Sequence, residues 1–435
     1  MRSTSAIVSK ANTSSTSTSA STVPPSRSRA SVVPKLKDRE GPYVPMPPLQ
    51  DPNTAPDVPA APTSGMYWSR APTSGAPHSP LRAHTTTLVG SNIFVFGGCD
   101  SRTCFNELYV LDADSFHWSN PQVFGDVPVP LRAMTCTAIN NKRLVVFGGG
   151  DGPAYYNDVY VLDTVNFRWH RPRIVSSGSD RDRDRDRGGG GGGTSNNGGG
   201  TTPAMPSPRR AHTACLYKNG IYVFGGGDGV RALNDIWRLD VSDPNKMSWK
   251  LISPSIPSSS SSKGDSTSGS KDSGSVSVGP AGAKAPRARG YHTANMVGSK
   301  LIVFGGSDGG ECFNDVWVYD VEARVWRAVH VPVTFRRLSH TSTLVGSYLF
   351  VVGGHDGAEY SNEVLLLNLV TMAWDRRRVY GLPPTGRGYH GVVLHDSRLV
   401  MIGGFDGSEV FGDVWILELA VHAYYSQISH FTIEV

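Results

Sequence analysis

The chain has 435 residues, of which 38% are hydrophobic, and its formal net charge is +5. This length accommodates two or three ordinary domains, and no apolar run reaches the roughly 20 residues that a membrane helix needs. We therefore expect no membrane span, and the small positive excess does not indicate a nucleic-acid partner.

The first 62 residues are rich in Ser, Thr and Pro and nearly free of aromatic side chains. Such a composition buries too little apolar surface to offset the entropy of ordering, so we expect a disordered tail over residues 1–62. The first residues lack the apolar segment of a secretory signal, and we expect none.

Five cysteines occur without a CxxC pair: Cys99, Cys104, Cys136, Cys215 and Cys312. An odd number without such a pair is typical of reduced thiols in an intracellular protein. We expect a cytoplasmic protein, with the nucleus as a second compartment.

From residue 66 onward the chain contains six copies of one module, which we take as one domain over residues 66–435. Each copy has a Gly-Gly pair after a short apolar run: Gly97-Gly98, Gly148-Gly149, Gly225-Gly226, Gly305-Gly306, Gly353-Gly354 and Gly403-Gly404. Tryptophans recur in register with these pairs: Trp68, Trp118, Trp169, Trp249, Trp326 and Trp374. Five copies have a histidine thirteen residues before the pair: His84, His212, His292, His340 and His390. The second copy has Met134 instead, fourteen residues before its pair.

Residues 301–326 display the module most clearly. An apolar run, a Gly-Gly bend, a polar turn, a second alternating run, another turn and a Trp follow one another. This order predicts strands joined by tight turns. One module has too little apolar surface to fold alone, so its apolar side chains must be buried against neighbouring copies. The paired glycines suit a positive φ or a close approach of two backbones.

The order of Gly-Gly, spaced aromatic residue and Trp, with 48 to 80 residues between successive pairs, resembles the kelch family. The resemblance implies an all-β, six-bladed β-propeller, each blade being a four-stranded antiparallel sheet. It also implies a non-enzymatic scaffold or adaptor that binds a protein partner, in cell polarity and signalling or in substrate recruitment to a ubiquitin ligase. We expect a monomer without cofactor or metal.

One alternative is a copper enzyme similar to galactose oxidase, which belongs to the same propeller superfamily. That resemblance would require copper held by His and Tyr, a Cys–Tyr crosslink and further domains. Nothing outside the repeats is large enough to supply those domains, so we expect no enzymatic activity.

Either end of the repeat region could close the ring. Trp68 stands sixteen residues before His84, the same gap as between Trp118 and Met134. It therefore matches the last strand of a module whose first three strands lie at the other end of the chain. Tyr424 also stands near the Trp position of the sixth module, so residues 424–435 are the alternative. We favour Trp68.

Two low-complexity insertions interrupt the repeats, at about residues 174–208 and 253–286. The first holds alternating Asp and Arg at residues 180–187 and a glycine run at 188–193, and the second is rich in Ser, Gly and Lys. We expect flexible loops, which a ring tolerates because the entropy of loop closure grows slowly with length.

If the strands a to d of a module alternate in direction, the b–c turns lie on one face of the ring. Each b–c turn carries an aspartate, which we interpret as turn-forming: Asp100, Asp151, Asp228, Asp308, Asp356 and Asp406. Positions that differ between copies are candidates for binding: Arg102, Tyr155, Arg231, Glu311, His355, Glu359, Tyr360, Phe405 and Glu409.

The recurrent histidine has two interpretations. One residue per module at the same height indicates a structural role, such as a hydrogen bond to the neighbouring blade. A ring of five histidines is too wide for one metal ion, so we expect no metal there.

Overall fold

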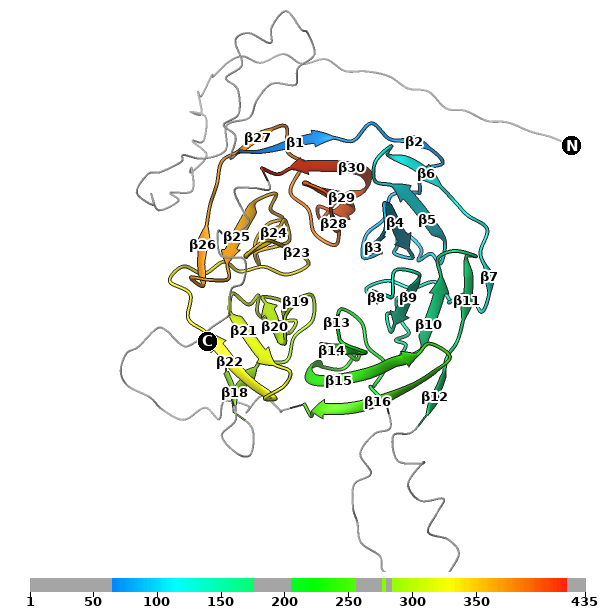
Figure 1. Cartoon of the computed structure of the whole chain (residues 1–435). Helices are drawn as coiled ribbons and strands as arrows, with labels where there is room; N and C mark the ends of the chain where they lie inside the picture. The colour runs from blue at the N-terminus through cyan, green and yellow to red at the C-terminus, as the bar shows by residue number, and fades with distance from the viewer. Residues whose placement is uncertain (1–64, 176–204, 256–275, 279–283, 421–435) are drawn as a thin grey trace, which may run out of the picture. The chain divides into compact units, whose positions relative to one another are not determined.

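The computed structural model describes residues 65–175, 205–255, 276–278 and 284–420, and the predicted disordered tail lies outside them. Six antiparallel sheets, one for each repeat, stand around a common axis (Figure 1). The predicted all-β, six-bladed propeller is therefore confirmed. Among the described residues no helix is long and apolar enough to span a membrane.

In every blade strand a lies nearest the axis, and the next strands follow outward (Figure 1). Blade 1 consists of β3 (Thr85–Val89), β4 (Asn92–Phe96), β5 (Leu108–Asp112) and β6 (His117–Ser119). Blade 2 consists of β8 (Thr135–Ile139), β9 (Arg143–Phe147), β10 (Val159–Asp163) and β11 (Arg168–His170). Blade 3 consists of β13 (Thr213–Tyr217), β14 (Gly220–Gly227), β15 (Ala232–Asp243) and β16 (Lys246–Ser253).

The second half of the ring repeats this order. Blade 4 consists of β19 (Thr293–Val297), β20 (Lys300–Phe304), β21 (Val316–Asp320) and β22 (Val325–Val329). Blade 5 consists of β23 (Thr341–Val345), β24 (Tyr348–Val352), β25 (Val364–Asn368) and β26 (Ala373–Asp375). Blade 6 consists of β28 (Gly391–His395), β29 (Arg398–Phe405), β30 (Val410–Glu418) and β1 (Met66–Arg70).

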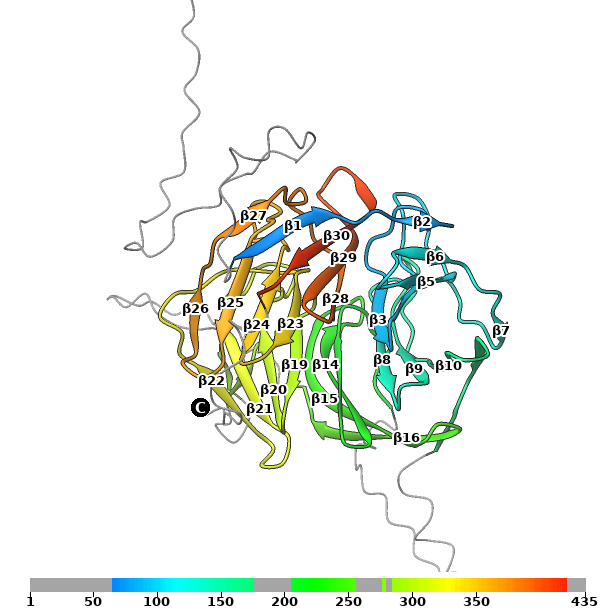
Figure 2. The same cartoon turned by 45° about the horizontal axis from the view of Figure 1, so that its top comes forward.

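The ring is closed by the N-terminal strand of the repeat region, as predicted. β1 pairs antiparallel with β30, and Trp68 stands opposite Leu417 (Figure 2). Met66 and Trp68 are buried in the apolar layer between blades 5 and 6. Residues 424–435, the alternative closing segment, lie outside the described residues.

Four blades gain a fifth, outermost strand that the sequence did not indicate. The connection leaving one blade runs parallel to strand d of the next, as β27 (Val379–Gly381) does beside β1, where Tyr67 pairs with Tyr380. The other such strands are β2 (Ser74–Gly75), β7 (Phe124–Gly125) and β12 (Arg173–Val175). Each blade of this kind is thus fastened to the preceding one on its outer side.

Parts of both predicted loop insertions form strands. β12 includes Ile174 and Val175 from the first insertion. In the second, β17 (Val276–Val278) pairs antiparallel with β18 (Lys284–Pro286). Most of the remainder of both insertions lies outside the described residues.

The paired glycines meet both requirements expected of them. Both residues of every pair have a positive φ, for example 65° at Gly97 and 89° at Gly98. A Cβ on Gly97 would lie 2.7 Å from the backbone oxygen of Leu131, which precedes the first strand of the next blade. A Cβ on Gly98 would lie 3.0 Å from the backbone oxygen of Arg82. The pair therefore lets one blade pack backbone against backbone on the next.

The core lies between adjacent blades, where each strand d tryptophan faces the preceding blade. In four blades its ring packs against the Phe that directly precedes the Gly-Gly pair of that blade, at centroid distances of 4.8–5.0 Å. Trp326, for example, lies 5.0 Å from both Phe224 and Tyr319.

We expect Trp326→Ala to lower the free energy of unfolding by about 3–5 kcal/mol, the usual cost of truncating a buried aromatic residue. Trp326 is 9% exposed and fills the layer between blades 3 and 4. Urea unfolding followed by circular dichroism measures the change. Arg324→Gln, an exposed change two residues away, is the control and should shift stability by at most about 0.5 kcal/mol. Equal stability of the two variants would contradict the packing role.

Candidate functional site

One face of the ring carries the b–c turns together with the segments that lead into strand a. We call these lead-in segments: residues 81–84, 131–134, 209–212, 289–292, 337–340 and 387–390. Each one forms a backbone bridge to the b–c turn of its own blade, as Arg82 does to Cys99 and Leu338 to His355. The b–c turns therefore lie together on one face, as predicted, and the connections between blades lie on that same face.

The lead-in segments are joined by a closed circle of backbone hydrogen bonds. The N–H of Ala133 donates to Ala83 O, and the N–H of Ala83 donates to Tyr389 O, both at 2.8 Å. The same bond recurs around the circle through Ala211, Tyr291 and Ser339, at 2.8–3.0 Å. All six residues are non-glycine with φ between 52° and 59°. Positive φ in such residues is strained, and strain of this kind concentrates at functional sites.

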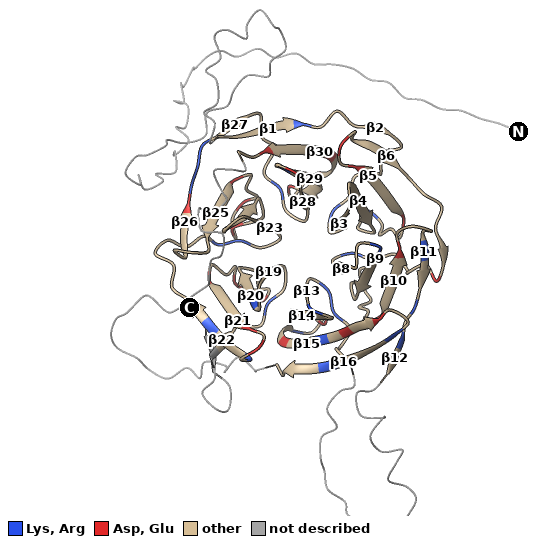
Figure 3. Cartoon of the chain, viewed as in Figure 1, with Lys and Arg blue, Asp and Glu red and all other residues tan. Residues whose placement is uncertain are grey.

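Three arginines stand beside this circle, and we call them the arginine mouth: Arg82, Arg132 and Arg210. Together with Tyr291 and Tyr389 they line a cavity of about 90 Å³ on the axis. Figure 3 shows Lys and Arg positions on the segments that surround the axis. In the part of the chain that the structure describes, none of the three forms an ion pair with a carboxylate.

The contacts of the arginine mouth are aromatic. The guanidinium of Arg82 lies 4.3 Å from the ring centroid of Phe405, and that of Arg210 lies 4.7 Å from Tyr155. Each arginine also has one buried side-chain nitrogen without a protein acceptor among the described residues. Three half-buried cations that form no ion pair with a carboxylate among the described residues favour the binding of an anion at this site.

A larger hollow of about 390 Å³ opens beside the mouth, over blades 2 to 4. Its lining includes the small residues Ala211, Gly227 and Gly290 together with Tyr155 and Tyr291. Arg210 and Tyr389 line both spaces, so the hollow continues into the mouth. An exposed valine, Val230, stands at its edge.

The turn aspartates are structural, as interpreted from the sequence. In each b–c turn one carboxylate oxygen accepts backbone N–H groups two or three residues onward, as Asp228 does from Val230 (2.9 Å) and Arg231 (2.8 Å). Such bonds stabilise the carboxylate and lower the pKa values of Asp100 and Asp406. The pKa of Asp151 is lowered mainly by the hydrogen bond from the Tyr156 hydroxyl, and further by the N–H of Ala154.

The structure brings some of the predicted binding residues together. Tyr155 and Arg231 line the hollow. His355, Tyr360 and Phe405 form a chain of edge-to-face rings, with centroid distances of 4.7 and 5.9 Å. The others are exposed at the tips of separate turns: Arg102, Glu311, Glu359 and Glu409.

Sequence reasoning missed the arginine mouth because two adjacent positions of the lead-in segment both carry arginine. The arginines that stand three positions before the histidine are buried and paired with acids, such as Arg209 with Asp235 (2.7 Å) and Arg289 with Asp315 (2.6 Å). The arginines that stand two positions before the histidine line the axis. The repeat pattern alone does not separate the two positions, because the arginine stands two residues before the histidine in some modules and three residues before it in others.

The recurrent histidines have the structural role expected from their spacing. Four of them share a hydrogen bond between Nε2 and a threonine Oγ1 of the preceding blade: His212–Thr135 (3.0 Å), His292–Thr213 (2.9 Å), His340–Thr293 (2.8 Å) and His390–Thr341 (3.2 Å). Gly391 stands where His84 would need its threonine, and Met134 takes the place of the histidine in blade 2. The galactose oxidase alternative would need His and Tyr side chains around one copper ion, but the recurrent histidines lie in five separate blades.

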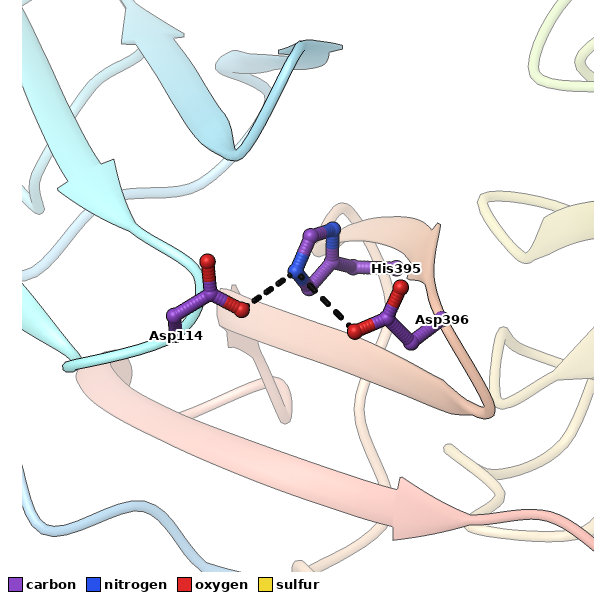
Figure 4. Close-up of side chains that lie close together, drawn as sticks. All are labelled: Asp114, His395 and Asp396. Atoms are coloured by element: carbon purple, nitrogen blue, oxygen red, sulfur yellow. Dashed lines mark hydrogen bonds and ion pairs between the residues drawn. The ribbon is translucent and has the colours of Figure 1, made fainter.

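A second polar cluster lies on the opposite face, where blade 6 meets blade 1 (Figure 4). Nε2 of His395 lies 2.8 Å from Oδ1 of Asp114 and 3.6 Å from Oδ2 of Asp396. These groups could approach one cation, but both carboxylates are more than half exposed and Arg398 already stands 3.7 Å from Asp114. We interpret the cluster as a polar contact across the closure of the ring.

Comparison with known proteins assigns the repeats. Residues 50–185 and 271–431 match the family described as the KLHDC2/KLHL20/DRC7 Kelch-repeats domain, and residues 208–250 match the Kelch motif. Similar proteins include Host cell factor of Drosophila melanogaster (25% identical, 58% of this chain and 16% of that protein). They also include the Rab9 effector protein with kelch motifs of Xenopus laevis (25%, 59% and 57%) and Kelch domain-containing protein 3 of Mus musculus (26%, 52% and 60%). The matches span less than two thirds of each of these relatives.

Proposed function

The chain belongs to the kelch-repeat family, and from this premise we propose that it is a non-enzymatic interaction propeller that binds a protein partner at the arginine mouth. The observation that carries the proposal is the set of three half-buried arginines without a carboxylate partner among the described residues. Arginine binds carboxylate and phosphate groups through paired hydrogen bonds. An anionic group of the partner would therefore occupy the mouth, and the hollow would hold the adjoining part of its chain.

The rim of this face favours a protein over a nucleic acid. The variable turn residues are Arg102 and Arg231 in blades 1 and 3, but Glu311, Glu359 and Glu409 in blades 4 to 6. Exposed glutamates would repel a long polyanion, whereas a folded or extended protein can present acidic groups to one half and basic groups to the other. Complementary charge of this kind directs specificity and the rate of association.

Membership of the kelch-repeat family also suggests a more specific cellular role for this protein. The partner would belong either to cell polarity and signalling or to a ubiquitin ligase, with this chain recruiting the substrate. We place the protein in the cytoplasm as a monomer without cofactor. Sedimentation of the purified chain tests the monomeric state, and fractionation of cells tests the compartment, both separately from binding.

We expect the triple variant Arg82→Gln, Arg132→Gln and Arg210→Gln to lose its protein partner, while its melting temperature stays equal or rises. The substitutions remove the cation–π contacts of Arg82 and Arg210, but they also remove the mutual repulsion of the three charges, which offsets this loss. Hot-spot truncations typically cost about 2 kcal/mol or more of binding, which is roughly a thirtyfold loss of affinity. Affinity capture with mass spectrometry, at low and high salt, compares the variant with the wild type.

Arg324→Gln is the matched control, because it removes an exposed arginine from a c–d turn on the opposite face. Partners should persist on this control and disappear from the triple variant. Retention of the same partners by both variants would refute the arginine mouth as the site. Ubiquitin-ligase subunits among the lost partners would favour recruitment, and their absence would favour signalling.

A further inference from the structure

Cys99 and Cys104 face each other across the b–c turn of blade 1, where they form an isolated antiparallel bridge. Two backbone hydrogen bonds flank this pair instead of joining it: Asp100 N–H to Thr103 O (3.1 Å) and Phe105 N–H to Gly98 O (2.9 Å). In such a non-hydrogen-bonded pair the Cα atoms lie about 4.5 Å apart and the side chains approach closely. Disulfides bridge Cα atoms about 4.4–6.8 Å apart, so the backbone already has the spacing that a disulfide needs.

We propose that Cys99 and Cys104 are an oxidation site, at which a small disulfide such as glutathione disulfide converts the two thiols into one intramolecular disulfide. The Cys104 thiolate attacks the reagent disulfide, forming a mixed disulfide and releasing one small thiol. Cys99 then attacks Sγ of Cys104 and releases the second. The two protein thiols lose two electrons to the reagent, and their two protons end on the two released thiols.

This order of attack follows from the burial of the two side chains. Cys104 is half-buried, whereas Cys99 is 3% exposed, so the reagent disulfide reaches Cys104 more readily. Burial, together with the adjacent Cys104 thiol, raises the pKa of Cys99 to about 12. Because the thiolate is the nucleophile, the closing step should become faster as the pH rises.

Oxidation would alter contacts at the edge of the arginine mouth. In the reduced protein the Cys104 thiol donates to the backbone oxygen of Asp151 in the b–c turn of blade 2, at 3.5 Å. A disulfide removes this donor and so releases one turn from the next. Cys99 also exchanges both backbone hydrogen bonds with Arg82, at 2.9 and 3.0 Å. A change in partner affinity on oxidation is therefore expected, and this consequence, unlike the disulfide itself, rests on the proposed function.

Blade 4 supplies a matched control within the same chain. Ser307 and Cys312 form the equivalent bridge, and the Cys312 thiol lies 3.7 Å from the backbone oxygen of His355 in the following turn. Cys312 thus resembles Cys104 in position and contact but has a hydroxyl where Cys104 has Cys99. It should form at most a mixed disulfide.

The test treats the full chain with glutathione disulfide at pH 8, alkylates the remaining thiols and digests with trypsin. Cleavage after Arg102 separates Cys99, in peptide 83–102, from Cys104, in peptide 103–132. We expect the two peptides to remain linked, and a reducing agent to separate them. Cys99→Ser should leave a mixed disulfide on Cys104, and Ser307→Cys should add a second link, to Cys312.

Unlinked peptides in the oxidised wild type would overturn the proposal, and so would links scattered over Cys136, Cys215 and Cys312. If the disulfide forms but the captured partners do not change, the oxidation site is supported and only its effect on partner binding is refuted. The triple arginine variant tests the proposed function independently, because it leaves both thiols in place.

Discussion

Deleting residues 1–72 is expected to open the ring and cause aggregation, whereas deleting residues 1–60 is expected to leave the melting temperature unchanged. The longer deletion removes β1, and with it four residue pairs to β30 and three to β27. It also removes Met66 and Trp68, which are 0% and 2% exposed. Two strand edges and an apolar layer would then face the solvent, and unprotected edges of this kind pair with other molecules.

Trp68→Ala separates loss of packing from loss of the strand. It keeps the backbone pairing of β1, so we expect about 3–5 kcal/mol of destabilisation without aggregation at moderate temperature. Light scattering and thermal unfolding distinguish the three variants. If the 1–72 deletion stayed folded and in solution, while truncation after Leu419 aggregated, residues 424–435 would be the closing segment.

The fold was predictable because a few residue types recur at the same spacing in each repeat. Gly-Gly pairs and tryptophans each occupy one structural position in every blade, and histidines do so in five of the six, so their register indicates the number of blades directly. The outermost parallel strands were not predictable in this way. β2 and β7 have two residues each, and they form because the connection between blades runs beside strand d, not because of their own sequence.

The candidate site was predictable only in part, for a similar reason. Variation between copies indicated the b–c turns, and two of the predicted residues, Tyr155 and Arg231, line the hollow. The arginine mouth combines residues from three blades that only closure of the ring brings around one axis. The absence of arginine two residues before the histidine in blades 4 to 6, where Gly290, Leu338 and Gly388 stand, is the signal that could have separated the two arginine positions.

Lowering the pH from 7 to 5 is expected to destabilise the propeller strongly, because five of its histidines are buried and neutral. Burial lowers the pKa of His84, His212, His340 and His390 to about 3, and that of His292 well below its usual value; nearby arginine or histidine side chains lower them further. In the unfolded chain each titrates near 6.5. Below pH 6.5 the unfolded chain therefore binds more protons than the folded one, and stability falls with pH until about pH 3.

The expected loss is about 1.4 kcal/mol for each histidine per pH unit below 6.5, against the about 5–15 kcal/mol that typically stabilises a folded domain. Carboxylates with lowered pKa values begin to contribute only below about pH 4–5, so the range from pH 6.5 to 5 reports mainly on histidines. Urea unfolding at several pH values in this range gives the number of protons taken up on unfolding.

His212→Met is the matched variant, because blade 2 already carries methionine at this position. It loses the hydrogen bond to Thr135 (3.0 Å), which costs about 1 kcal/mol at pH 7. It also removes one titrating group, so we expect proton uptake on unfolding to fall by close to one. Stability that is the same at pH 7 and pH 5, or an unchanged proton uptake in His212→Met, would mean that these histidines are not held neutral between the blades.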